Sequence, residues 1–92
     1  MSKIERTVSV RGLAEWLLRD YLTDLGACPD RQEPAAQRMI AEGWRVSWTR
    51  DTVRMSGSAL ALTQFDLVFS GDADAVARAQ AEFMRKAQRG GG

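Results

Sequence analysis

Histidine is absent from the 92 residues of this chain, and cysteine occurs once, as Cys28. The sequence therefore lacks the commonest general base and metal ligand. A single cysteine forms no internal disulfide, no Cys–His nucleophile pair and no thiolate zinc site by itself. Glycine-rich phosphate-binding motifs are absent as well. We therefore expect that the protein is not an enzyme and holds neither a cofactor nor a metal.

Long apolar runs and one-sided charge are also lacking. No segment reaches the ~18 consecutive apolar residues that a membrane span needs, and the first residues are not followed by the apolar core of a signal peptide. The formal net charge of +1 is spread along the chain, which argues against a nucleic-acid surface. With one cysteine, a reducing compartment is the natural location. We expect a cytoplasmic protein that binds neither nucleic acid nor membrane.

Apolar and polar residues alternate over residues 44–50 and 65–69, and helical patterns flank this stretch. Period-2 alternation is typical of a half-buried strand, and a 3.6-residue period is typical of a half-buried helix. The chain length suits one domain, residues 1–92. We predict a two-layer α+β fold, in which helices pack on one face of an antiparallel meander sheet of four or five strands. The predicted order is β-α-α-β-β-β(-β)-α.

Two helices are predicted in the first half of the chain. After a strand with Ile4, Val8 and Val10 on one face, residues 13–25 carry a broad apolar arc and end near Gly26, a typical left-handed cap. Residues 34–42 suit a second, short helix, with Pro34 at its first position and Gly43 after its end.

Turns and a register change are predicted in the second half. Residues 50–52 and 56–58 suit hairpin turns, and a change of apolar parity near residues 63–64 indicates a β-bulge or a break. Asp72 suits the N-cap of a last helix. Residues 88–92 are predicted to form a flexible, glycine-rich tail.

Trp16 is the most unusual residue of the first predicted helix, because it falls in the middle of the polar arc. An exposed tryptophan among charged residues is typical of an interface hot spot. The alternative is that the loop over residues 27–33 or the chain terminus covers it. The partner-contact candidates are Trp16, Arg19 and Asp20, and a homodimer is the simplest form of such contact.

Apolar residues of the strands and the last helix could either fill the core or line a ligand pocket. Core packing is the ordinary role of tryptophans that share a strand face with valine. The pocket candidates are Trp44, Trp48, Phe65, Phe69, Gln80 and Met84. Asp66, the carboxylate within the sheet region, is expected on the solvent face with an ordinary pKa.

The sequence ends in Gly90, Gly91 and Gly92, after Arg89. This Arg-Gly-Gly end resembles the tail of ubiquitin-like and sulfur-carrier proteins, whose terminal carboxylate is adenylated and then carries a thioester or thiocarboxylate. Such a tail must be extended to thread a narrow channel, which glycine permits. The alternative is a helix that frays at its end.

Two segments, residues 43–48 and 62–67, are similar to a small uncharacterised bacterial family. In some of its members this region follows a MoaD-like (molybdopterin-synthase small-subunit-like) domain, and this chain has no MoaD-like portion of its own. The resemblance implies a TBP-like β-α-β(4)-α arrangement and no catalytic residues. We expect a non-enzymatic accessory module that binds a protein partner. The alternatives are an accessory or carrier in sulfur transfer of the molybdenum-cofactor type, and a small-ligand sensor.

Overall fold

One antiparallel sheet with helices on a single face organises the chain, in a computed structural model that describes residues 3–54, 56–57 and 59–90. The described part contains five strands and two helices, in the order β1 (Lys3–Arg11), α1 (Glu15–Asp24), β2 (Cys28–Pro29), β3 (Arg38–Ala41), β4 (Trp44–Arg54), β5 (Ala61–Asp72) and α2 (Ala73–Gly90). The predicted α+β class, with helices on one face of an antiparallel sheet, is confirmed.

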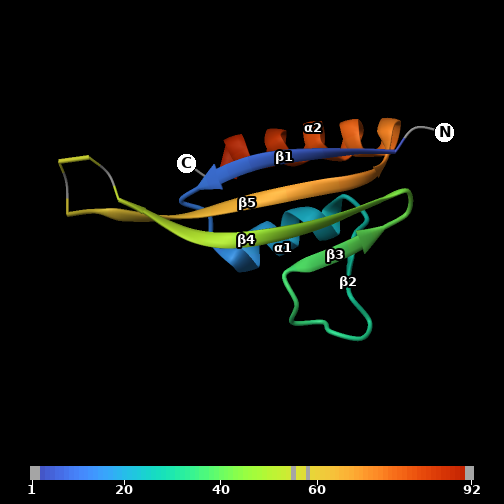
Figure 1. Cartoon of the computed structure of the whole chain (residues 1–92), viewed down its shortest axis with the longest axis horizontal. Helices are drawn as coiled ribbons and strands as arrows, with labels where there is room; N and C mark the ends of the chain where they lie inside the picture. The colour runs from blue at the N-terminus through green and yellow to red at the C-terminus, as the bar shows by residue number, and fades with distance from the viewer. Residues whose placement is uncertain (1–2, 55, 58, 91–92) are drawn as a thin grey trace.

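The strands lie in the order β1-β5-β4-β3-β2, and every neighbouring pair is antiparallel (Figure 1). The N-terminal strand β1 therefore pairs with β5, the last strand of the chain. Both ladders of β5 are in unbroken register, from Lys3 opposite Asp72 on one side and from Trp44 opposite Gly71 on the other. This long-range pairing fixes which polar residues of β1 meet those of β5.

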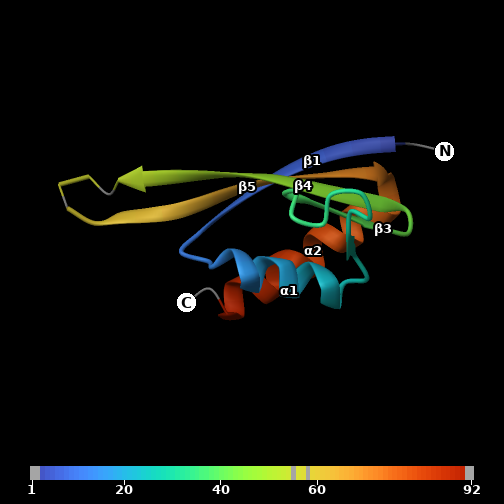
Figure 2. The same ribbon diagram turned by 90° about the horizontal axis from the view of Figure 1, so that it is seen from below.

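Helices α1 and α2 lie on the same side of the sheet, and the opposite side is open (Figure 2). The covered side holds the core, because residues that alternate along each strand point toward the helices. The ring of Phe69 lies at its centre, 5.7 Å from the ring of Trp44 and 5.8 Å from the ring of Phe83 on α2. Leu18 and Leu22 of α1 are fully buried against this layer.

The end of α1 and the start of α2 are each capped by hydrogen bonds. Gly26 has a φ of 102°, and the N–H of Ala27 donates to the C=O of Leu22 at 3.0 Å, so α1 ends in a Schellman motif. Before α2, the N–H of Ala75 donates to the carboxylate of Asp72 at 3.3 Å. The predicted cap residues Gly26 and Asp72 are therefore both confirmed.

The predicted second helix over residues 34–42 is wrong, because residues 38–41 form strand β3. Met39 is buried opposite Val46, while Arg38 and Ile40 are exposed. A strand here provides partners for the backbone groups on the outer edge of β4, which a helix could not do. Gly43 does adopt a positive φ, of 87°, but within the β3–β4 turn and not after a helix.

The predicted turn at residues 50–52 and the predicted bulge near residues 63–64 are also wrong. Strand β4 continues to Arg54, and its ladder with β5 continues without interruption to Ala61. This hairpin extends past the helices as an arm, which we define as residues 50–54 of β4 and residues 61–64 of β5 (Figures 1 and 2). On the arm no helix covers either face, so the apolar parity no longer marks the core.

The order β-α-β-β-β-β-α is the order of elements that the resemblance implies. A relationship to the TBP-like fold itself stays a prediction. At the end of the chain, α2 runs through Gly90, so residues 88–90 of the expected flexible tail are helical. The remaining expected tail residues, Gly91 and Gly92, lie outside the described residues.

Candidate functional site

Trp16 lies on the outer side of α1 with 70% of its surface exposed. The loop that follows the helix does not cover it, although that loop was the alternative from the sequence. Asp20, one turn further along α1, is exposed as well. Because Leu18 and Leu22 anchor the opposite side of the helix, the indole is presented from a fixed element. The pair Trp16 and Asp20 forms the candidate contact surface.

Arg19, the third predicted contact residue, is occupied within the protein. Its guanidinium lies 5.0 Å from the centre of the Trp48 ring and donates to the C=O of Ala36 at 3.0 Å. Longer hydrogen bonds reach the C=O groups of Ala35 and Pro34. A guanidinium presents several donors in a rigid fork and stacks on aromatic faces, which suits this position. Arg19 therefore fastens the loop before β3 to α1, and it is not an open contact residue.

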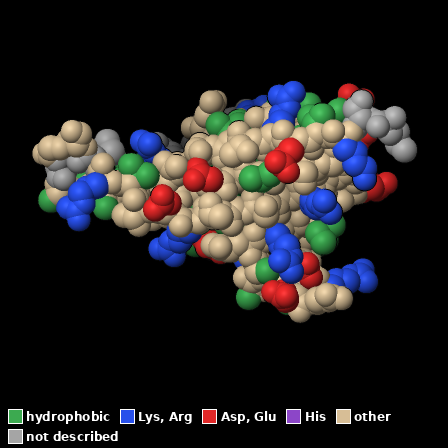
Figure 3. All heavy atoms as spheres, in the orientation of Figure 1, with side chains coloured by type: hydrophobic (Ala, Val, Ile, Leu, Met, Phe, Trp, Pro, Cys, Tyr) green, Lys and Arg blue, Asp and Glu red, His purple; other side chains and the backbone are tan. Residues whose placement is uncertain are grey.

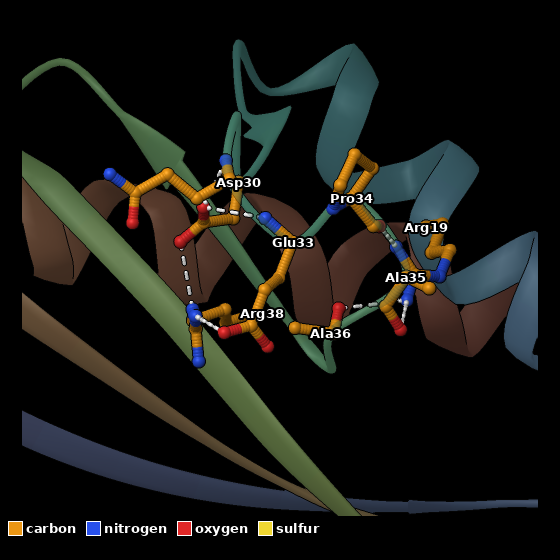
Figure 4. Close-up of polar contacts among 8 residues, drawn as sticks. Arg19, Asp30, Glu33, Pro34, Ala35, Ala36 and Arg38 are labelled. Atoms are coloured by element: carbon orange, nitrogen blue, oxygen red, sulfur yellow. Dashed lines mark hydrogen bonds and ion pairs between the residues drawn. The ribbon is translucent and has the colours of Figure 1, made fainter.

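The same loop is closed by a second arginine, as Figure 4 shows. Asp30 accepts hydrogen bonds from the N–H of Gln32 at 2.8 Å, from the N–H of Glu33 at 3.1 Å, and from the Nε of Arg38 at 2.8 Å. The hydrogen bond from Arg38, followed by those from the two amides, holds the pKa of Asp30 below its ordinary value. These contacts explain how a polar loop keeps one conformation beside the sheet.

The pocket candidates are mostly packed against one another. Phe65 and Phe69 are fully buried, Trp48 is 3% exposed, and Trp44 is also buried. Gln80 and Met84 of α2 are half-buried. These aromatic side chains occupy the space between sheet and helices and belong to one hydrophobic cluster. The indole N–H of Trp48 is buried without a hydrogen-bond partner in the described structure.

The open face of the sheet carries a polar network that the sequence analysis did not identify. Ser9 of β1 donates to Asp66 of β5 at 2.5 Å, and Gln64 donates to the same carboxylate oxygen at 2.9 Å. Arg11 donates in turn to the amide oxygen of Gln64 at 2.8 Å. The hydrogen bond from Ser9 is the main reason that the pKa of Asp66 lies below its ordinary value. The expected position of Asp66 is confirmed, and the expected ordinary pKa is wrong.

Two shallow hollows adjoin each other on this open face, with volumes of about 650 and 360 Å³. Both are lined by Ile40, Arg45 and Ser70, and the Nε of Arg45 donates to the hydroxyl of Ser70 at 3.3 Å. Acidic and basic side chains are interspersed over this face, without a large area of one sign (Figure 3). The hollows therefore lack the one-sided electrostatics of an anion or cation site.

Parity along each strand indicated the open face, since Ser9, Thr49 and Asp66 all alternate with apolar residues. It could not indicate the network, because the β1–β5 register that places Ser9 opposite Asp66 is a long-range pairing. For the same reason the loop contacts of Arg19 and Arg38 leave no local pattern in the sequence.

The described residues contain no group of three or more acidic, cysteine or histidine side chains that could hold a metal ion. Within the same residues, neither helix has the length and apolar character to cross a membrane. The exposed Cys28 lies on the short edge strand β2, opposite Ile40.

The family described as archaeal MoaD-like protein matches residues 6–92, which is nearly the whole chain. The expectation that this chain has no MoaD-like portion is therefore wrong, because the match covers the described sheet and helices. No curated protein matches the chain.

Proposed function

The chain belongs to the archaeal MoaD-like protein family, and from this premise we propose that it is a non-enzymatic accessory module that acts through protein–protein contact. The observation that carries this proposal is the exposure of Trp16, 70% of whose surface is in contact with water. Covering a large aromatic side chain with a partner returns about 25 cal/mol for each Å² of apolar surface buried.

The surroundings of Trp16 support this contact. Asp20 lies one turn away and is exposed, so a polar rim borders the indole. The helix is held rigid by the buried Leu18 and by the Schellman motif at Gly26, so little conformational entropy is lost when a partner binds. A second copy of the chain is the simplest partner.

The test compares Trp16→Ala with Gln88→Ala, a control at an exposed position of α2. Self-association by sedimentation velocity and capture of proteins from the host lysate are measured for both variants. We expect Trp16→Ala to weaken the contact about 30-fold, as truncation of a hot spot of about 2 kcal/mol does. Its free energy of unfolding should change by less than about 0.5 kcal/mol. Unchanged association, or loss of the fold, would contradict the proposal.

A second candidate is a carrier or accessory role in sulfur transfer of the molybdenum-cofactor type, with Gly92 as the attachment point. The family membership and the glycines at residues 90–92 favour it. Because α2 includes Gly90, this chemistry would require its last residues to leave the helix. The test is incubation with host extract and ATP, followed by mass spectrometry. A mass increase on Gly92 that depends on ATP would support this role. The absence of such an increase would exclude it.

A further inference from the structure

The outer edge of β4 is only partly covered. Strand β3 pairs with residues 44–47, and the N–H of Trp48 donates to the C=O of Gln37 at 3.0 Å. In an antiparallel strand, alternate residues direct both backbone groups to the same edge. Arg50, Thr52 and Arg54 therefore direct their N–H and C=O groups to the outer edge of the arm.

Most of these backbone groups are available to a partner. The N–H of Thr52 donates to the carboxylate of Asp51 at 2.8 Å. For the other groups on this edge, the structure of the described residues shows no hydrogen-bond partner. An unpaired strand edge of this kind is a template onto which another extended chain can add.

Two arginine side chains mark one face of the same edge. Arg50 and Arg54 are exposed and, among the described residues, form no ion pair or side-chain hydrogen bond. They share the parity of Trp48, so they lie on the helix side of the sheet, in the hairpin that extends past the helices (Figure 2). The two arginines are four positions apart along the strand, so their Cα atoms are about 13 Å apart. The two cations would thus face two side chains four positions apart on an added strand.

A polypeptide suits this edge better than the other possible occupants. Nucleic acid would meet only the two arginines, in a chain whose net charge is +1. A second copy would meet like charges in the pairings that use all of residues 50–54. A two-fold pairing centred on Thr52 sets Arg50 opposite Arg54, and one centred on Asp51 sets the two Asp51 side chains opposite each other. Like charges directly opposite are unfavourable across strands.

We propose that the outer edge of β4, at Arg50, Thr52 and Arg54, binds an extended segment of a partner protein that carries acidic residues four positions apart. The segment adds to the sheet as a further strand, and its carboxylates pair with the two arginines. This contact is on a different element from Trp16 and does not depend on the function proposed above.

The probe is a synthetic peptide of alternating valine and threonine with two glutamates four residues apart, labelled for fluorescence anisotropy. Its control carries lysines in place of the glutamates. We expect the acidic peptide to bind at least about tenfold more tightly than the lysine peptide, since opposite charges across an interface favour one partner over another. The double variant Arg50→Glu/Arg54→Glu should reverse this preference, and Trp16→Ala should leave it unchanged.

The backbone contribution is tested with Thr52→Pro against Thr52→Val. The N–H at residue 52 faces outward, so proline removes no bond of the β4–β5 ladder but obstructs an incoming strand. We expect proline to abolish peptide binding and valine to preserve it, with thermal unfolding as the check of the fold. Binding that persists in both the proline variant and the charge-reversed variant overturns the proposal. Tighter binding of a single-stranded oligonucleotide than of the peptide, or self-association that competes with the peptide, overturns it too.

Discussion

Strands β4 and β5 run through two different environments, the layered body of the protein and the projecting arm. In the body, β4 alternates buried and exposed residues from Trp44 to Trp48, and β5 alternates buried and half-buried residues from Phe65 to Phe69. On the arm the same two strands keep their register, but the buried positions are lost. Backbone pairing thus continues where side-chain packing has ended. The comparison teaches that strand register and core formation are separable in this chain.

The largest expected effect separates the two regions directly. We expect Phe69→Ala in the body to lower the free energy of unfolding by about 3–5 kcal/mol, because it removes a ring packed against Trp44 and Phe83. Leu62→Ala on the arm, where the side chain is 36% exposed, should change it by less than about 1 kcal/mol. Urea denaturation followed by tryptophan fluorescence measures both. Equal losses would mean that the arm is packed in solution.

The next effect compares two glycines with positive φ, Gly71 in the body and Gly57 beyond the arm. A Cβ at Gly71 would lie 2.8 Å from the Cα of Trp44 and closer still to the C=O of Gly43. Gly57 has no atom within 4 Å of that position. We expect Gly71→Ala to destabilise by about 3 kcal/mol or more, from strain and overlap together. Gly57→Ala should cost only about 1 kcal/mol. Thermal unfolding distinguishes them, and similar melting temperatures would contradict the close approach.

A smaller effect concerns Arg19, which packs on Trp48 where β4 leaves the body. We expect Arg19→Ala to destabilise by about 1–2 kcal/mol, because it removes several hydrogen bonds and the ring contact. Arg19→Lys should recover little, since lysine lacks the planar fork. Hydrogen exchange of residues 30–37 should accelerate in both variants. Arg85→Ala, which removes an exposed pair with Glu82, is the control and should change stability by less than about 0.5 kcal/mol.

The smallest effect is a pH dependence on the open face. Folding lowers the pKa of Asp66 from its ordinary value of 3.8, so its contribution is present above that pH and is lost as the pH falls through the lower, folded value. We expect Ser9→Ala to raise the pKa of Asp66 toward 3.8 and to weaken this acid dependence. NMR titration of the side-chain carboxyl groups measures the shift. Asp30, held by Arg38, serves as the internal reference and should not move.

Local sequence signals were reliable where one element decides the outcome. The apolar arc around Leu18 and Leu22, the cap at Gly26 and the cap at Asp72 all depend on neighbours within a few residues. The place of Trp16 on the polar side of α1 follows from helix periodicity in the same way. The helix predicted over residues 34–42 was wrong because residues 38–41 pair with β4, whose outer edge needs hydrogen-bond partners. Short segments with both helical and strand character are settled by such a neighbour.

The sequence alone determined the α+β class, the covered and open faces of the strands, and the place of Trp16 on the polar side of its helix, because periodicity and capping are properties of neighbouring residues. Only the tertiary structure decided that β1 lies beside β5, that Ser9 meets Asp66, that Arg19 holds the loop before β3, and that β4 continues into a projecting arm. These features depend on contacts between residues distant in the chain. The free energy of such contacts depends on the whole packed arrangement, which no local pattern contains.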